Sequence, residues 1–386
     1  MYDLIIVGAG PAGLSLAARL AETPLRIALI EKQSEAVLAD PAYDGREIAL
    51  TQTSITRLKE LGAWQHVQPH EAAPLRRADV LNGRSAFVLG FADRRGQNAL
   101  GALVANSAIR RSLYAATKEQ SNCHLFAGES ATFVGRDADV NYVRLSDGRM
   151  LVGKLLVGAD TRFSALRQSQ GIGAQMTDFG RTMLVCRVRH EKPHDGVAIE
   201  WFDHNQTIAM LPLVAGQSSF VLTLPADAMR QLGALNAADF TAEIERRTQR
   251  RWGALSLTSA RFFYPLVAVY AQRFVAPRFA LIGDAAVGMH PVTAHGFNFG
   301  LSSAFLLGRE IKEAVAKGGD IADPAQLERF ERVHRRATFP LFTATNAIAK
   351  LYSDERPLAR LARSAGLRLM RATPGARAIV EASLRG

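Results

Sequence analysis

Apolar and polar positions alternate in a regular order along the first 32 residues. The run YDLIIV, from Tyr2 to Val7, predicts a buried strand. GAGPAG then predicts a turn, and LSLAARLAE has the 3.6-residue period of a helix. RIALIEK predicts a second buried strand. The N-terminal residues therefore form a strand–helix–strand unit, which is typical of parallel sheets.

The pattern changes further along the chain. Helices are predicted over 55–64 and 107–119, and short strands separated by turn residues over 124–160. From Arg181 four strands follow one another between Gly, Asp or Asn turns: RTMLVCRVRHE, GVAIEWFD, QTIAMLPLV and SSFVLTLPAD. This spacing predicts an antiparallel sheet. Helices over 236–251 and 297–317 enclose a further strand, RFALIGDAA.

These elements predict an α/β fold. A Rossmann-like nucleotide-binding domain is interleaved with an antiparallel-sheet substrate domain, and C-terminal helices follow. We place the first part of the nucleotide domain at 1–177, with a short excursion near 75–97 to the substrate domain. The substrate domain covers 178–268, and the chain returns to the nucleotide domain at 269–320. A helical, basic amphipathic region takes up 321–386.

A net charge of +11 points to anionic partners. Seven arginines and one acid, Glu381, lie among apolar residues in 356–386, which is the composition of a basic amphipathic segment. Such a segment binds an anionic membrane surface or a biosynthetic complex, or packs as a helical hairpin on its own domain. No recognition helix, zinc finger or aromatic RNA-binding signature accompanies the charge, so we expect no nucleic-acid partner.

Location and redox state follow from what the sequence lacks. No apolar run approaches the roughly 18 residues that cross a bilayer, and the strand starting at Tyr2 leaves no room for a signal peptide. We expect a cytoplasmic protein, either free or peripheral at the inner membrane surface. Cys123 and Cys186 lack metal or redox spacing and are expected to be reduced structural thiols.

The first turn carries a nucleotide-binding fingerprint. Gly8, Gly10 and Gly13 form G-x-G-x-x-G between a strand and a helix. The first glycine permits the tight turn, the second lets the backbone approach a pyrophosphate, and the third lets helix and strand pack closely. Glu31 ends the second strand 18 residues later, where a carboxylate can accept from a ribose 2′-OH. We count Lys32 beside it among the cofactor-binding candidates.

A second strand end distinguishes between dinucleotides. RFALIGDAA delivers Gly283 and Asp284 to the carboxyl edge of the sheet, where Asp284 would accept from the hydroxyls of a ribityl chain. NAD has no ribityl chain, so the pattern favours FAD. The segment continues as VGMHPVTAHGFNFG. Its proline stiffens the loop, and Gly296, Phe297 and Asn298 begin a helix whose N–H groups could stabilise negative charge on a flavin ring. The cofactor-binding candidates in this segment are Pro291, Gly296, Phe297 and Asn298.

The sequence resembles the class A FAD-dependent aromatic monooxygenases, which have the p-hydroxybenzoate hydroxylase fold. Within that group it is similar to the ubiquinone-biosynthesis hydroxylases. The resemblance spans nearly the whole chain. It is carried by GAGPAG, DGREIALTQTSITRLKELGAW, LVANSAIRRSL, LLVGADTRFSALR and GDAAVGMHPVTAHGFNFGL.

The resemblance implies further cofactor-binding residues. Arg46 matches an arginine that lies beside the flavin, and Arg110 matches another cofactor-facing arginine. The family's Gly-Ala-Asp-Gly signature reads Gly-Ala-Asp160-Thr161 here, so its Asp is retained and its last Gly is not. His295 stands where relatives of this subgroup usually have Gln.

His290 and His295 are the candidates for a catalytic base. They can equally be loop histidines that bond to the backbone. No third ligand is spaced with them, so we expect no metal site.

The resemblance implies an FAD-dependent monooxygenase that hydroxylates the ring of a polyprenylated phenol in ubiquinone biosynthesis. NAD(P)H would be the reductant and O2 the co-substrate, with oxygen transferred from a flavin C4a-hydroperoxide. The alternatives are a soluble-phenol hydroxylase or a prenyl-lipid reductase of the same fold. A third alternative is a flavin-retaining structural subunit of a membrane-associated complex. We expect the antiparallel sheet to roof an apolar pocket, or to use the same side chains as its core: Phe202, Met210, Pro212 and Phe220.

Overall fold

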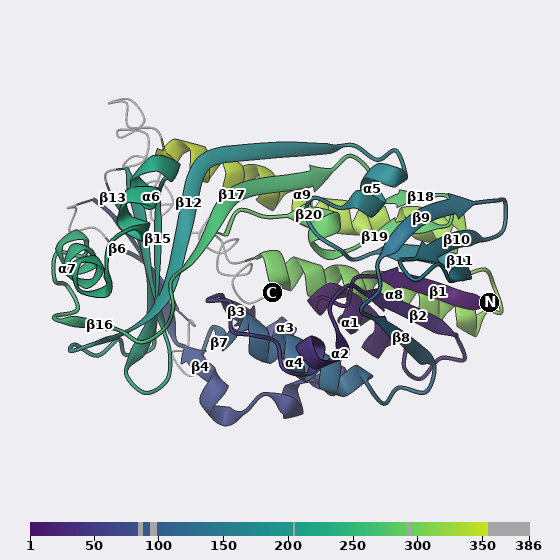
Figure 1. The fold of residues 1–386 in the computed structure, drawn as a ribbon, viewed down its shortest axis with the longest axis horizontal. Helices are drawn as coiled ribbons and strands as arrows, with labels where there is room; N and C mark the ends of the chain where they lie inside the picture. Colours follow the sequence, from purple (N-terminus) through teal and green to yellow (C-terminus); the bar gives the residue numbers. More distant parts are fainter. Residues whose placement is uncertain (84–87, 93–98, 204, 292–294, 354–386) are drawn as a thin grey trace.

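The computed structural model describes residues 1–83, 88–92, 99–203, 205–291 and 295–353. The predicted basic segment at 356–386 lies outside these residues. Figure 1 shows two halves joined by two long strands. The half that contains the N-terminus and the predicted G-x-G-x-x-G turn is called the nucleotide-binding half, and the other half is rich in antiparallel strands. Within the described residues, no helix has the length and apolar character needed to cross a bilayer.

The nucleotide-binding half is built on an eight-stranded sheet whose central strands are parallel, in the order β18-β19-β11-β1-β2-β8. Leu4, Ile5 and Ile6 of β1 have no exposed surface, because helices and strands cover both faces of the sheet. The strands are β1 (Tyr2–Val7), β2 (Ile27–Glu31), β8 (Cys123–Ala127), β9 (Ala131–Arg136), β10 (Asn141–Leu145), β11 (Met150–Gly158), β18 (Val275–Ala276) and β19 (Phe279–Leu281).

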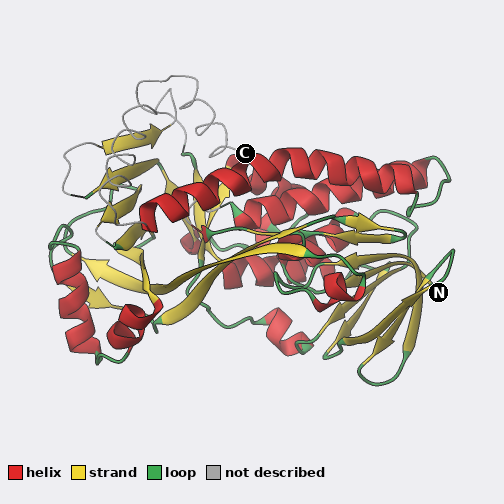
Figure 2. Ribbon diagram, turned by 90° about the horizontal axis from the view of Figure 1, so that it is seen from above, coloured by secondary structure: helices red, strands yellow, loops and turns green. Residues whose placement is uncertain are grey.

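Helices pack around this sheet (Figure 2), and α8 runs through the middle of the molecule beside α1 (Figure 1). The helices of this half are α1 (Pro11–Arg19), α2 (Glu35–Ala39), α3 (Gln52–Glu60), α4 (Asn106–Thr117), α5 (Ala165–Ser169), α8 (Gly296–Ala316) and α9 (Pro324–Ser353). Three short 3-10 turns accompany them: η1 (Trp64–His66), η2 (Pro69–Glu71) and η3 (Gly283–Ala285). A small antiparallel sheet leads towards the other half through β3 (Glu47–Thr51), β7 (Gly101–Ala105) and β4 (Ala72–Leu75).

The other half is a nine-stranded sheet in the order β20-β17-β12-β15-β14-β13-β5-β6, with β16 paired to β12. The four strands predicted after Arg181 are confirmed as antiparallel neighbours. The strands are β5 (Arg77–Asn82), β6 (Val88–Ala92), β12 (Ala174–His190), β13 (Val197–Asp203), β14 (Gln206–Pro212), β15 (Gln217–Pro225), β16 (Leu255–Leu257), β17 (Phe262–Ala271) and β20 (Val287–Gly288).

The two faces of this sheet have different surroundings. α6 (Ala226–Gly233) and α7 (Ala237–Arg247) cover the outer face, where a core forms around Trp201, Met210 and Phe220. Met210 and Phe220 therefore belong to the core on the outer face. Of the four side chains expected to roof the pocket, Phe202 lines the cavity between the halves, and Met210, Pro212 and Phe220 do not.

The strands β12 and β17 are long enough to belong to both halves (Figure 1). They pair from Ala174 and Ala271 at one end to Val185 and Phe262 at the other. Their register shifts between Asp178 and Thr182, where Gly180 has a φ of +63°. The predicted boundary at 177–178 falls at this irregularity, inside one strand.

His334 on α9 carries a prediction for stability. Its side chain is buried between Phe330 and Phe274, at ring-centroid distances of 5.8 and 5.4 Å, and burial lowers its pKa to about 4. The unfolded chain binds a proton near pH 6.5, so the stability that the neutral imidazole confers is complete above pH 6.5 and is lost as pH falls towards 4.

Between pH 7 and pH 4 the parent should lose up to about 3 kcal/mol of unfolding free energy through His334, and His334→Phe should not show this loss. The measurement is the thermal unfolding midpoint of each protein between pH 4 and 7. His124 is an exposed histidine and gives the matched control, His124→Phe. Equal acid sensitivity of the His334 variant and the parent would contradict the prediction.

Candidate functional site

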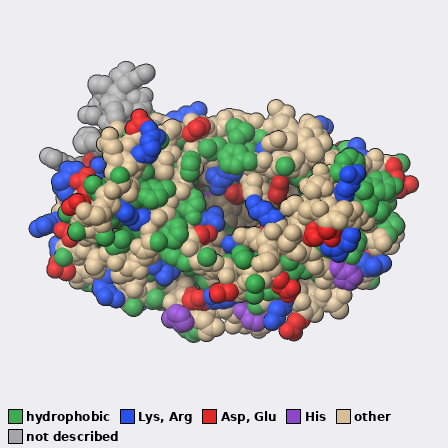
Figure 3. Space-filling model, in the orientation of Figure 1, with side chains coloured by type: hydrophobic (Ala, Val, Ile, Leu, Met, Phe, Trp, Pro, Cys, Tyr) green, Lys and Arg blue, Asp and Glu red, His purple; other side chains and the backbone are tan. Residues whose placement is uncertain are grey.

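A cavity of about 1390 Å³ lies between the two halves. In the space-filling view it is a hollow near the middle of the molecule, with charged side chains inside it (Figure 3). The strand ends of the nucleotide-binding half form one wall. The other wall is the face of the nine-stranded sheet opposite α6 and α7, which we call the inner face. One continuous cavity, open to the surface, therefore adjoins both halves.

The β1–α1 turn has the backbone geometry that its glycines predict. Gly8 has a φ of +109°, and a Cβ there would lie 2.5 Å from the Ala159 carbonyl oxygen. A Cβ on Gly13 would lie 1.9 Å from the carbonyl oxygen of Gly8, so the third glycine sets the approach of α1 to β1. A Cβ on Gly10 would meet no protein atom within 4 Å, and Gly10 lines the cavity. The open side of the turn is thus directed at the cavity.

The N-terminus of α1 also faces the cavity. Gly10 is its N-cap and Pro11 its first residue, and no side chain caps it. Its free N–H groups and the positive end of the helix dipole form a site for an anion such as a pyrophosphate.

Glu31 supports the β1–α1 turn from the end of β2. Its Oε2 accepts from the Ala9 N–H at 2.8 Å, and its Oε1 accepts from the Gln33 N–H at 2.9 Å. Gln33 in turn accepts from Arg110 Nη2 at 2.5 Å. Lys32 is exposed at the same rim of the cavity. A sugar hydroxyl bound at the end of β2 would donate a hydrogen bond to the Glu31 carboxylate, which already accepts from the backbone of the β1–α1 turn.

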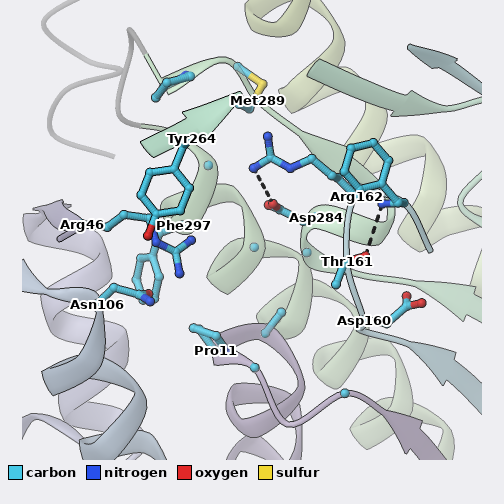
Figure 4. Close-up of a pocket in the computed structure, with 18 of the residues that line it drawn as sticks. Pro11, Arg46, Asn106, Asp160, Thr161, Arg162, Tyr264, Asp284, Met289 and Phe297 are labelled. Atoms are coloured by element: carbon cyan, nitrogen blue, oxygen red, sulfur yellow. Dashed lines mark hydrogen bonds and ion pairs between the residues drawn. The ribbon is translucent and has the colours of Figure 1, made fainter. Parts of the chain in front are cut away.

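Asp284 lies across the cavity floor in η3, and it carries an ion pair that the sequence does not predict. Arg162 donates from Nη2 to Asp284 Oδ2 at 3.0 Å and from Nη1 to the Val267 carbonyl at 2.8 Å (Figure 4). Gly283, with a φ of +62°, donates its N–H to Ser303 Oγ on α8 at 3.0 Å. The turn is therefore fixed to α8, and the carboxylate is held at the cavity by an arginine.

Asp160 follows β11 and lines the cavity. Its Oδ1 is buried without a hydrogen-bond partner among the described residues, and burial raises the pKa of its carboxyl above the ordinary value. A buried oxygen with no partner is costly unless a ligand satisfies it. Thr161, at the altered signature position, does not have a positive φ, so its side chain causes no backbone strain.

Arg46 stands on the other side of the cavity with Tyr264 and Phe297 (Figure 4). Its Nη2 donates to Asp44 Oδ2 at 2.6 Å, and its guanidinium carbon lies 5.6 Å from the centroid of the Tyr264 ring. Asn106 Nδ2 donates to the same carboxylate oxygen at 2.8 Å. Asp44 therefore holds the arginine at the cavity edge.

Most of the predicted site residues lie in this one cavity. Those that line it are Gly8, Gly10, Glu31, Lys32, Arg46, Arg110, Asp160, Gly283, Asp284, His290, Pro291, Gly296 and Phe297. Gly13, His295 and Asn298 do not. The Asn298 side chain instead joins α8 to β3, since its Nδ2 donates to the Ala49 carbonyl at 3.0 Å and its Oδ1 accepts from the Thr51 N–H at 3.3 Å.

The two histidines have different surroundings. His290 packs edge-on against Phe179, with ring centroids 4.6 Å apart, and burial lowers its pKa to about 4, so it is neutral near pH 7. His295 is the N-cap of α8, and its ring lies 5.6 Å from that of Phe299. The described residues contain no group of three or more His, Cys, Asp or Glu that could hold a metal ion.

The sequence prediction missed several lining residues, among them Asn106, Arg162, Glu200 and Tyr264. Arg162 lies two residues after Asp160 in a segment already recognised, and Glu200 is an acid in the middle of the largely apolar strand VAIEWFD. Both signals were present in the sequence. The partners of Arg162, Asp284 and the Val267 carbonyl, come from distant segments that no local pattern connects to it.

The residues of the cavity fit FAD. An open glycine and an uncapped helix N-terminus suit the pyrophosphate, and the unpartnered Asp160 oxygen and the Asp284 carboxylate suit hydroxyls. The fold and the cavity define a flavin-binding oxidoreductase.

Comparison with known proteins agrees with this class. The FAD binding domain family matches residues 1–338. Ubiquinone hydroxylase UbiM of Neisseria meningitidis is 41% identical over the whole chain and 84% of its own length. Ubiquinone hydroxylase UbiL of Rhodospirillum rubrum is 34% identical over 95% of the chain and 85% of its own. A probable FAD-dependent monooxygenase of Pseudomonas aeruginosa, pqsL, shares the fold with a TM-score of 0.77 at 21% identity, over 95% of this chain and 99% of that one. The chain belongs to the FAD binding domain family and is a flavoprotein monooxygenase.

Asp284 gives a direct prediction for FAD. Asp284→Ala should raise the Kd for FAD by about tenfold to a hundredfold, because it removes the carboxylate that we predict to accept a charge-assisted hydrogen bond from the cofactor. The measurement is the flavin-to-protein absorbance ratio after desalting, followed by a titration of the apoprotein. Asp320→Ala, which removes another Asp–Arg pair with Arg278 far from the cavity lining, is the control. An unchanged flavin ratio in Asp284→Ala would refute this role.

Proposed function

We propose that this protein hydroxylates the aromatic ring of a polyprenylated phenol in ubiquinone biosynthesis, with FAD as cofactor, NAD(P)H as reductant and O2 as co-substrate. The observation that carries the proposal is the single cavity, which adjoins the nucleotide-binding strand ends on one side and a largely apolar sheet face on the other. The relatives named as ubiquinone hydroxylases support this substrate class.

The residues of the nucleotide-binding half would hold FAD along this cavity. The Gly8–Gly10 turn and α1 would bind the pyrophosphate, and Glu31 and Lys32 the adenosine ribose. The residues proposed to hold the ribityl chain and the flavin ring are Arg46, Arg110, Asp160, Gly283, Asp284, Pro291, Gly296 and Phe297.

The opposite wall would receive the aromatic ring of the substrate. FAD, when bound, supplies the activation of O2, so the protein needs no catalytic triad. Its own groups orient the ring and keep water out. The sheet face suits this task because it carries mainly apolar or small side chains: Met183, Val185, Phe202, Thr207, Ala209, Val221 and Thr223.

The same proposal includes a peripheral membrane location. A polyprenyl substrate partitions into the bilayer, and the basic amphipathic composition of 356–386 suits an anionic membrane surface or a biosynthetic complex. A protein that ends at Glu355 should bind less to anionic liposomes in a flotation assay and keep its flavin spectrum. Loss of flavin from that protein would instead make the segment part of the folded core.

The deciding experiment is the quinone profile of cells depleted of this protein, measured by mass spectrometry with and without its restoration. Accumulation of a polyprenyl phenol lacking one oxygen is expected and would identify the ring position. An unchanged profile would refute the pathway. In vitro, NADPH oxidation should rise when a prenylated phenol is added; firmly bound FAD without any turnover would favour a structural subunit.

A further inference from the structure

Glu200 is an acid in an apolar part of the cavity. It lies in the middle of β13, and backbone pairing places it in a row that crosses the sheet. Every other member of that row is apolar: Leu89, Val80, Ala209, Val221 and Val185. Side chains of paired residues point to the same face of a sheet, so the row forms a strip. Glu200, Ala209, Val221 and Val185 line the cavity.

The orientation of Glu200 follows from its neighbours along the strand. Ile199 and Trp201 pack into the core beneath α6 and α7, on the outer face. The alternation of a strand therefore directs Glu200 and Phe202 to the inner face. Phe202 begins the next row on that face, which continues through Thr207, Thr223, Met183 and Tyr264. Arg46 contacts Tyr264, so this row reaches the nucleotide-binding side of the cavity.

Glu200 has neither an ion-pair nor a hydrogen-bond partner among the described residues. Burial alone raises the pKa of its carboxyl to about 8, without a contribution from any charged neighbour. Ser219, on the same inner face, has a buried Oγ that also lacks a partner in the described chain. Apolar residues would stabilise this strip better than an uncompensated acid, which points to a ligand.

We propose that Glu200 binds a ring hydroxyl of the aromatic substrate and so selects oxygenated rings over plain hydrocarbons. The proposal rests on the proposed function. A phenol bound against the apolar strip would hydrogen-bond to the carboxyl of Glu200, and its prenyl chain would lie against apolar side chains. A site with a buried polar group discriminates strongly against a ligand that leaves the group unpaired, which is the property required here.

Binding to the oxidised holoenzyme tests this without turnover. The probes are 2-geranylphenol and geranylbenzene, which differ only in the hydroxyl, and the readout is the change in flavin absorbance on titration. The parent should bind the phenol about tenfold more tightly than the hydrocarbon. Glu200→Leu should reduce this ratio to about twofold or less, and Glu200→Gln, which keeps hydrogen-bonding groups, should retain most of it.

Two readouts separate binding from folding. Flavin content should be unchanged in both variants, and Glu200→Leu should unfold at the same or a higher temperature, because it removes a half-buried acid that has no charged or hydrogen-bonding partner among the described residues. Glu243→Gln, an exchange of a carboxylate on α7 that pairs with Arg246 in the same half but does not line the cavity, is the control.

The outcomes distinguish this inference from the proposed function. A tenfold preference for the phenol that persists in Glu200→Leu would overturn the role of Glu200 and leave the substrate class intact. Equal affinity of the parent for the two probes would also overturn the role of Glu200 and leave the substrate class intact. A flavin-replete parent that binds neither probe would overturn the substrate class, and the role of Glu200 with it.

Discussion

Gly13→Ala is expected to give a protein that loses FAD and unfolds at a markedly lower temperature. The added Cβ would lie 1.9 Å from the Gly8 carbonyl oxygen and 3.3 Å from the Ala159 Cβ. Backbone cannot yield as a flexible side chain does, so α1 must move away from β1. We expect the overpacked contact to lower the free energy of unfolding by about 1–3 kcal/mol. Flavin content should be near zero, because the proposed pyrophosphate site is built from the same turn.

Gly10→Ala, in the same turn, separates packing from cofactor binding. Its Cβ would meet no protein atom within 4 Å, so the apoprotein should unfold at the parent temperature. The methyl group would lie on the open side of the turn, and FAD affinity should therefore fall. Thermal unfolding of both apoproteins and flavin titrations would show the contrast. Equal thermal stability of the two variants would contradict this account of the third glycine.

Arg187→Leu is expected to destabilise the junction between the halves by about 3–5 kcal/mol. The side chain of Glu47 on β3 is 1% exposed, and its Oε1 accepts from Arg187 Nε at 2.8 Å and Nη2 at 2.6 Å. The Tyr43 hydroxyl donates to the same oxygen at 3.0 Å. Removing the arginine would leave a buried carboxylate without its counter-charge. The thermal unfolding midpoint of the holoenzyme should fall accordingly.

The double variant Glu47→Leu/Arg187→Leu should recover most of this loss, because it buries no charge. Burial already raises the pKa of Glu47 despite its arginine, and the single variant should raise it further. A raised folded-state pKa makes stability fall as pH rises, so the defect of Arg187→Leu should be smaller at pH 5 than at pH 8. A double variant as unstable as the single one would show that Arg187 acts by packing instead.

Local patterns predicted much of the fold. The strand–helix–strand unit and the antiparallel strands after Arg181 follow from hydrophobic period and turn residues, which act over a few positions. The pattern did not show which face of the sheet lies at the cavity. β13 and β14 are apolar on both faces, and only the packing of α6 and α7 decides that Met210 and Phe220 are core and Phe202 is not.

The same limit applies to the site. Its glycines and Asp160 were predicted because strand ends and short motifs are local. The partners were not, since Arg162 reaches Asp284 across 122 positions and Asn298 joins residues about 250 positions away. Asn298, a cofactor-binding candidate, does not line the cavity, and its side chain joins α8 to β3. A polar residue in a motif can serve the scaffold as easily as the ligand.

The strands β12 and β17 join the two halves without a linker. Two paired backbones resist bending more than a single loop does, and the β12–β17 pairing is interrupted between the halves only by the register shift at Asp178–Thr182. The sheet thus acts as a spacer of fixed length between the nucleotide-binding strand ends and the inner face. Changes of substrate in such a scaffold must come from side chains on that face, because the spacing itself is set by backbone hydrogen bonds.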